Sequence, residues 1–149
     1  MVLRKHRISR RRGAVAAEAA IVLIPVMSLI FGVFEYSRLL MDWNLLNNAA
    51  REGCRYAVVN NTSTTISTDV QSTVTKFMSG QSAAFSNFTV TVTGTHQGAV
   101  TAVNNLAAGD MVTVTVSGTY KFMNIVPLVK LPTSFTITSA VIMGCEGGL

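Results

Sequence analysis

The sequence predicts an α+β fold in which a long N-terminal helix packs on a small antiparallel β-sheet. Two patterns support this prediction. Apolar residues recur at steps of three and four from Leu39 to Ala57, and from Phe88 onward they alternate with threonines. The first spacing places side chains on one face of a helix, and the second places them on one face of a strand. We therefore expect a helical N-terminal part followed by a β-rich part.

The size and charge of the chain limit its architecture and its partners. With 149 residues, 49% of them hydrophobic and 13% charged, we expect one domain and at most one membrane segment. Six of the 12 cationic residues precede the first acid, Glu18, and they are Arg4, Lys5, Arg7, Arg10, Arg11 and Arg12. The remaining body is nearly neutral and has no basic stripe, so we expect no nucleic-acid partner.

The basic residues precede an apolar run that is long enough to cross a membrane. Residues 14–34 would span about 31 Å as a helix, close to the hydrocarbon thickness of a bilayer. Lys and Arg beside an apolar segment stay in the cytoplasm. We predict a basic cytoplasmic leader at 1–13, a transmembrane helix at 14–40 in the cytoplasmic membrane, and an extracytoplasmic domain at 41–149 whose first helix continues to about residue 59.

A cleaved export signal explains this segment less well than a retained transmembrane helix does. A secretory signal has an apolar stretch of about 7–15 residues followed by a small-x-small site. Here the run 19–34 is longer, and it is followed by Glu35, Tyr36, Ser37 and Arg38. A twin-arginine signal can be drawn from residues 9–11, but Arg12 and Gly13 stand where apolar residues should follow. We therefore expect no cleavage beyond Phe34.

A single acid, Glu18, lies near the start of the apolar run. A carboxylate deep in hydrocarbon is costly, so it needs a partner or a place near the headgroups. In one interpretation Glu18 lies at the cytoplasmic interface, in the first turns of a helix whose dipole favours an anion. In the other, the chain is cut between Gly13 and Ala14, and Glu18 becomes the fifth residue of the mature protein.

This order of a basic leader, a glycine and then a glutamate in an apolar helix resembles the processing signature of type IV pilin-like proteins. The resemblance implies cleavage after Gly13 by a prepilin peptidase. It also implies that Glu18 pairs with the new α-amino group, on Ala14, of a neighbouring subunit when helices pack into a filament. Such a pair would give a partner to an otherwise costly buried charge.

The next residues resemble the TadE-like proteins of the Tad (tight adherence, Flp pilus) systems. The matching elements are Glu18, Pro25, the Glu-aromatic-small-Arg step at 35–38, and the block NAAREGCRYA at 48–57. The resemblance covers about the first 60 residues. It implies an assembly helix whose residues of interest are Glu18, Pro25, Glu35, Tyr36, Arg51 and Arg55.

One departure from the pattern narrows the expected role. Flp major pilins carry tyrosine directly after the fifth-position glutamate, whereas this chain carries Ala19 and is longer. The resemblance therefore implies a minor pilin or pseudopilin, with a prepilin peptidase, other pilin-like subunits and a Tad-type assembly platform as partners. The alternative is an uncut, single-pass anchored binding domain that does not assemble.

After the apolar run, the helix becomes amphipathic. We expect one face to pack on the domain, formed by Leu39, Trp43, Leu46, Ala50, Gly53 or Cys54, and Ala57. The other faces should be solvated and carry Asp42, Asn47, Asn48, Arg51 and Arg55. Glu35 and Asp42 are spaced to pair with Arg38 on this solvated surface. Pro25 removes one backbone hydrogen bond and should bend the helix.

A shorter amphipathic helix is predicted from Ile66 to Met78, and three strand-like stretches follow: FTVTVTG (88–94), MVTVTVSGTY (111–120) and FTITSAVIM (135–143). We expect the long helix to cover the apolar face of these strands. The threonine face should be solvated, although it could also meet a partner or a sugar. The connection at 97–110 has room for a short strand, and 124–132 should form a loop at the sheet edge.

Cys54 and Cys145 are the two cysteines. Outside the cytoplasm we expect them to form a disulfide, worth about 4–5 kcal/mol in the chain-entropy model for a loop of roughly 90 residues. The alternative is two unpaired thiols. A zinc site would need more ligands than these cysteines and His96 supply, so we expect no metal. No catalytic spacing or phosphate-binding loop is apparent, and we expect neither an enzyme nor a cofactor.

Overall fold

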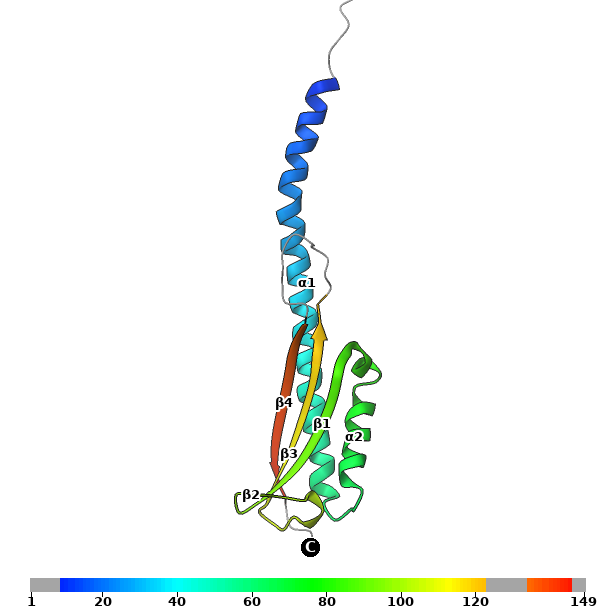
Figure 1. The fold of residues 1–149 in the computed structure, drawn as a ribbon, viewed down its shortest axis with the longest axis vertical. Helices are drawn as coiled ribbons and strands as arrows, with labels where there is room; N and C mark the ends of the chain where they lie inside the picture. Colours follow the sequence, from blue (N-terminus) through cyan, green and yellow to red (C-terminus); the bar gives the residue numbers. More distant parts are fainter. Residues whose placement is uncertain (1–8, 123–133, 146–149) are drawn as a thin grey trace, which may run out of the picture.

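The computed structural model describes residues 9–122 and 134–145 (Figure 1). Residues 1–8 of the basic leader and the predicted loop at 124–132 lie outside this described part. Within it the chain forms one very long helix, one short helix and one antiparallel sheet. The predicted α+β arrangement is confirmed.

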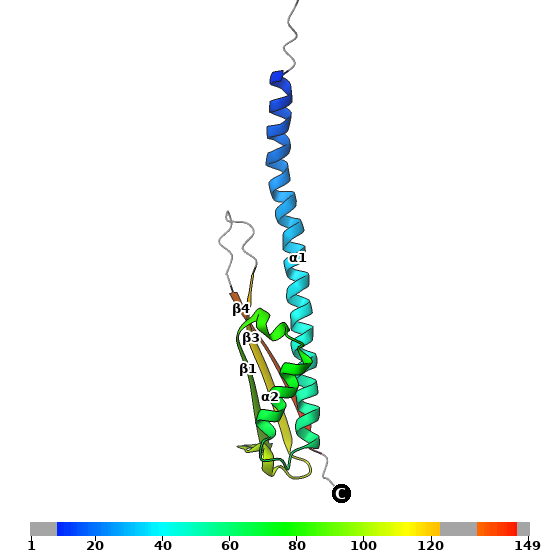
Figure 2. The same ribbon diagram turned by 90° about the vertical axis from the view of Figure 1, so that its right-hand side faces the viewer.

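The long helix α1 runs without interruption over Ser9–Val59. Its C-terminal half packs on the sheet and on the second helix, whereas its N-terminal half projects from the domain (Figure 2). The two halves differ because the apolar residues of the N-terminal half surround the helix and are exposed, whereas the C-terminal half has a buried stripe that includes Leu46, Ala50 and Cys54. The helix therefore belongs to the domain along only part of its length.

The second helix, α2 (Ile66–Phe77), lies beside the C-terminal half of α1 (Figure 1). Its buried residues Ile66, Val70 and Val74 are four apart and form one stripe. The helices approach closely at Gly53 of α1, where a Cβ atom would lie only 2.7 Å from Cγ2 of Val74. A short 3₁₀ helix, η1 (Gln81–Ala84), then leads into the sheet.

Four strands form the antiparallel sheet: β1 (Phe85–His96), β2 (Ala99–Thr101), β3 (Met111–Lys121) and β4 (Ser134–Gly144). Their order is β2-β1-β3-β4, which makes β4 one edge and the short β2 the other. β2 occupies the connection where the sequence had room for a short strand, and a 3₁₀ helix, η2 (Val103–Asn105), follows it. β3 and β4 pair in unbroken register along all eleven residues of each strand.

The core lies between the sheet and the two helices. Val112, Val114 and Val116 of β3 are fully buried, together with Leu46, Ala49, Ala50, Cys54 and Ala57 of α1. On the opposite face of the sheet, threonines and serines lie side by side on neighbouring strands, as in the pairs Thr91 with Thr115 and Ser117 with Thr138. The alternation of valine and threonine in the sequence correctly predicted the buried and the more exposed face of β3.

The packed face of α1 is rotated from the predicted one. Asp42, expected in solvent, is 4% exposed, whereas Trp43, expected in the core, is 48% exposed. The buried stripe passes through Asp42 and Leu46, which are one turn apart, and Trp43 lies about 100° round the helix from Asp42. Asn47 is also drawn into the packing, because its side-chain oxygen accepts a hydrogen bond from the Ser139 hydroxyl on β4.

Candidate functional site

The N-terminal half of α1 is the most unusual surface of the chain. It contains an 18-residue window with a mean hydropathy of 2.3, none of it buried, in a helix long enough to cross a membrane. Its large exposed side chains include Ile21, Leu23, Leu29 and Phe34. Water would solvate such a surface poorly, because each large apolar side chain gains about 1.5–3 kcal/mol when it is buried. This half of the helix therefore needs an apolar environment.

The three predicted processing residues, Gly13, Ala14 and Glu18, lie in the first turns of α1. Ala14 and Glu18 are four residues apart and thus lie on one face of the helix. A Cβ atom at Gly13 would meet nothing within 4 Å. The Glu18 side chain is exposed and makes no ion pair or hydrogen bond with any residue in the described ranges. The carboxylate is thus available to a group outside the part of the chain that the structure describes.

Pro25 lies within α1, and the helix continues past it. Proline has no N–H, so the carbonyl of Ile21 loses its usual donor. One turn further on, the Ser28 hydroxyl donates a hydrogen bond to the carbonyl oxygen of Ile24 at 2.9 Å. This carbonyl is not the one that Pro25 leaves without a donor, so the Ser28 hydroxyl does not replace the missing bond.

A polar junction marks the place where α1 reaches the sheet. The Tyr120 hydroxyl on β3 donates a hydrogen bond to Glu35 Oε1 at 2.9 Å. The Arg38 guanidinium lies over the Tyr120 ring, 4.9 Å from its centroid, and donates to the carbonyl oxygen of Lys121 at 3.3 Å. Nη1 of Arg38 and Oε2 of Glu35 are 3.9 Å apart. Glu35 and Arg38 therefore attach α1 to β3 and do not form a solvated surface pair.

Burial and the hydrogen bond to Glu35 raise the pKa of Tyr120 to about 12. The phenol thus stays protonated and remains a donor at physiological pH. Its ring is 1% exposed and meets Phe122 edge to face, with centroids 5.3 Å apart. Tyr36, the neighbour of Glu35, points elsewhere and is 61% exposed. The junction therefore includes Glu35 but leaves Tyr36 on the open surface.

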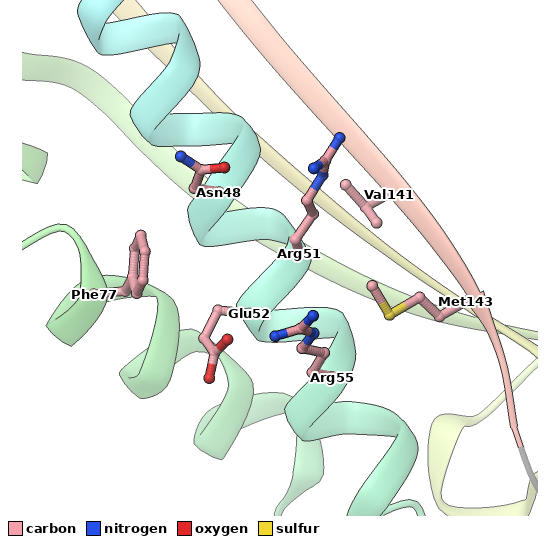
Figure 3. A pocket seen from close by; sticks show the side chains of 7 residues that line it. All are labelled: Asn48, Arg51, Glu52, Arg55, Phe77, Val141 and Met143. Carbon is pink, nitrogen blue, oxygen red and sulfur yellow. The ribbon is translucent and has the colours of Figure 1, made fainter.

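The predicted residues Arg51 and Arg55 line a groove on the outer side of α1 (Figure 3). The groove has a volume of about 540 Å³, and its other lining residues are Asn48, Glu52, Phe77, Val141 and Met143. In Figure 3, Arg51 lies on the side of Val141 in β4, whereas Glu52 lies on the side of Phe77 in α2. Neither guanidinium forms an ion pair or a hydrogen bond with any other residue that the structure describes.

The disulfide expected between Cys54 and Cys145 is not formed in the structure, where both are buried free thiols. The Cys54 thiol faces the sheet and donates to the carbonyl oxygen of Val141, at an S···O distance of 3.0 Å. Burial raises the pKa of this thiol, which keeps it protonated. Cys145 follows β4, where its backbone N–H bonds to the carbonyl oxygen of Asp110 at 2.7 Å.

His96 and Asp110, which the sequence analysis did not link, lie in contact at the end of the sheet away from the apolar half of α1. His96 Nδ1 lies 2.7 Å from Asp110 Oδ1, and the backbone N–H of Ala107 donates to Asp110 Oδ2 at 2.7 Å. The hydrogen bond from Ala107, and then the one from His96, lower the pKa of Asp110. Over the described ranges, no three His, Cys, Asp or Glu side chains lie close enough to hold a metal ion.

The family comparison matches the same part of the chain that carries these features. The model of the TadE-like protein family matches residues 13–55. This segment is TadE-like. It extends from the exposed apolar half of α1, through the junction with Tyr120, to the two arginines of the groove. No curated protein and no solved structure has a significant match to the chain.

The match confirms the family resemblance drawn from the sequence and associates the chain with the Tad pilus system. Together with the apolar half of α1, the TadE-like segment indicates a membrane anchor. The sequence did not reveal the role of Tyr120. Its place at an inward position of a strand was a usable signal, because a buried tyrosine hydroxyl requires a hydrogen-bond partner.

Proposed function

We propose that this chain is a minor pilin or pseudopilin, a structural component of an Flp-type (Tad) pilus or a related secretion apparatus. The observation that carries the proposal is the TadE-like match over 13–55, which coincides with a helix that is half anchor and half domain. Its partners would be a prepilin peptidase, other pilin-like subunits and the Tad-type assembly platform.

The exposed half of α1 supports insertion into the cytoplasmic membrane through residues 14–40. Its apolar side chains surround the helix, as lipid requires, and a helix satisfies its own backbone hydrogen bonds. The cationic residues before Gly13 would remain in the cytoplasm and direct the α+β domain to the other side. The junction at Glu35 and Arg38 would then lie near the membrane surface, where polar groups are tolerated.

Glu18 supports assembly as the purpose of this anchor. Its carboxylate has no partner in the described part of the chain, and a charge within the bilayer is costly. Cleavage after Gly13 would create an α-amino group on Ala14, four residues from Glu18. In a packed array, the α-amino group of one subunit would pair with the Glu18 carboxylate of the next, and both charges would be neutralised.

The first test is the N-terminal residue of the mature protein, measured by mass spectrometry of the N-terminal peptide recovered from membranes. We expect Ala14. The variant Gly13→Val should retain the leader, and Gly32→Val is its matched control, because a Cβ atom meets nothing within 4 Å at either glycine. An intact leader in the native protein favours the uncut anchor, and a start beyond Phe34 means secretion. Either result overturns the proposal.

The second test separates assembly from insertion. Glu18→Ala and Glu18→Gln should both insert into the membrane and both fail to join the pilus or assembly complex, because neither can pair with an α-amino group. Membrane fractionation reports insertion, and crosslinking or co-purification reports assembly. If both variants assemble like the native chain, Glu18 is only an interfacial acid and the assembly model is wrong.

A further inference from the structure

The edge of the sheet at β4 lacks the features that usually block strand addition. An edge strand exposes a row of N–H and C=O groups, which proteins commonly protect with charges, prolines, bulges or very short strands. β4 is eleven residues long, SFTITSAVIMG, with no charge and no proline, and it pairs with β3 in unbroken register. Within the described ranges, no strand pairs with its other side.

The groove described above lies directly beside this edge. Val141 and Met143 of β4 form one wall, and α1 supplies two cations, Arg51 on the side of Val141 and Arg55 between Glu52 and Met143 (Figure 3). The acid of the groove, Glu52, lies on the opposite side, toward Phe77. A strand added to β4 would therefore direct every second side chain toward the two arginines.

The spacing of the arginines suits an extended chain. Arg51 and Arg55 are four residues apart, which is about 6 Å along a helix. Alternate residues of a strand are about 6.6–6.8 Å apart. β4 runs alongside α1 (Figure 1), so an added strand would run along the helix as well. Two carboxylates at positions i and i+2 of that strand would each reach one guanidinium.

We propose that the β4 edge and the groove bind an extended, acidic segment of a partner protein. The segment would hydrogen-bond to β4 through its backbone and present two carboxylates, two positions apart, to Arg51 and Arg55. Lipid headgroups are a poorer occupant, because Arg51 lies about 16 Å beyond Leu40 along the helix axis. This interaction does not depend on cleavage after Gly13 or on Glu18, so its test is independent of the proposed function.

The probe is a fluorescein-labelled peptide of about ten residues in which threonine and glutamate alternate, added to the full chain in detergent micelles. Fluorescence anisotropy should show binding with a Kd below about 1 mM. Two further peptides serve as controls: one alternates threonine with lysine, and one has the same composition as the probe but with its glutamates in adjacent pairs separated by pairs of threonines, so that no two glutamates lie two positions apart. Both should bind at least about tenfold more weakly, because neither places carboxylates at alternate positions.

The double variant Arg51→Glu/Arg55→Glu should weaken binding of the acidic peptide by about tenfold or more. The matched control is Lys76→Glu/Lys121→Glu, which changes the net charge equally at two exposed lysines outside the groove. It should change the Kd by less than about threefold. Equal effects of the two double variants would reduce the interaction to general charge attraction and overturn the proposal.

Hydrogen exchange distinguishes strand addition from attachment through side chains alone. Bound peptide should slow amide exchange in β4, because the outward N–H groups of an edge strand become hydrogen-bonded. Exchange in β1 serves as the internal reference and should not change. Failure of the acidic peptide to bind, or binding without slower exchange in β4, would overturn the proposal.

Discussion

The Tyr120 hydroxyl donates a hydrogen bond to the carboxylate of Glu35, at 2.9 Å, at the point where the long helix leaves the sheet. The two residues are 85 positions apart in the sequence. With Arg38 over the ring of Tyr120, they form a polar contact between α1 and the sheet at the place where the apolar half begins. They therefore hold the helix at the boundary between domain and anchor.

We predict that Tyr120→Phe destabilises the domain by about 1.5–3 kcal/mol, because a hydrogen bond to a charged group is lost while the buried ring is kept. Tyr56→Phe is the control, since the Tyr56 hydroxyl makes no hydrogen bond within the described residues. Thermal unfolding of the full chain in detergent, followed by circular dichroism, measures the difference. Equal unfolding temperatures for the two variants would show that the Glu35 contact contributes nothing to stability.

Asp42 should make stability depend on pH. Burial raises the pKa of this carboxyl, with Arg38 opposing the shift. An acid whose pKa is higher in the folded than in the unfolded state destabilises the fold when it is ionised, so its cost is present at neutral pH and disappears as the pH falls below the ordinary value. Asp42→Asn should therefore unfold at a higher temperature than the native chain at pH 7.

The advantage of Asp42→Asn should shrink as the pH falls below about 4, because the native carboxyl is then neutral as well. Glu52→Gln removes an acid from the open groove of the same helix and provides the comparison. Melting curves recorded at several pH values test this prediction. A variant that is less stable than the native chain at pH 7 would show that Asp42 gains more from Arg38 than it loses through burial.

Gly53→Ala should destabilise the domain although alanine is the better helix former. The added methyl group would lie 2.7 Å from Cγ2 of Val74 and 3.3 Å from atoms of Val70 and Val114. Overpacking of this kind costs about 1–3 kcal/mol, against about 1 kcal/mol gained in helix propensity. The double variant Gly53→Ala/Val74→Ala should recover part of the overpacking loss. Full stability of the single variant would mean that the helices separate without cost.

The two thiols offer a direct chemical test. Cys54 and Cys145 are both buried, so an alkylating reagent should label the native chain slowly and label both residues quickly after denaturation without reductant. Mass spectrometry of the protein isolated from membranes counts the labels. Labelling that appears only after reduction would instead identify the disulfide expected from the sequence.

The sequence predicted best where one pattern continued over many residues. The valines of β3 were predicted to face the helix because every second residue points the same way, and they do. The TadE-like segment was recognised from an ordered series of residues. The face of α1 was harder, because apolar residues are so common near Trp43 that spacing alone did not fix which side turns inward.

Contacts between distant residues could not be read from local spacing. Glu35 and Arg38 look like an ordinary surface pair until β3 brings Tyr120 to them. His96 and Asp110 also meet only because the turns around β2 return the chain to the same end of the sheet. Such contacts depend on which strands become neighbours, and a single sequence carries little information about that choice.

Because α1 is unbroken over Ser9–Val59, one continuous helix joins the apolar half to the domain. A continuous helix contains no flexible linker, so rotation of the apolar half about the helix axis also rotates the domain. The arginine groove and the threonine face lie on opposite sides of the sheet. A half-turn of the anchor would therefore exchange the two faces, so the rotational setting of the helix in a membrane would decide which face of the domain is presented to a neighbour.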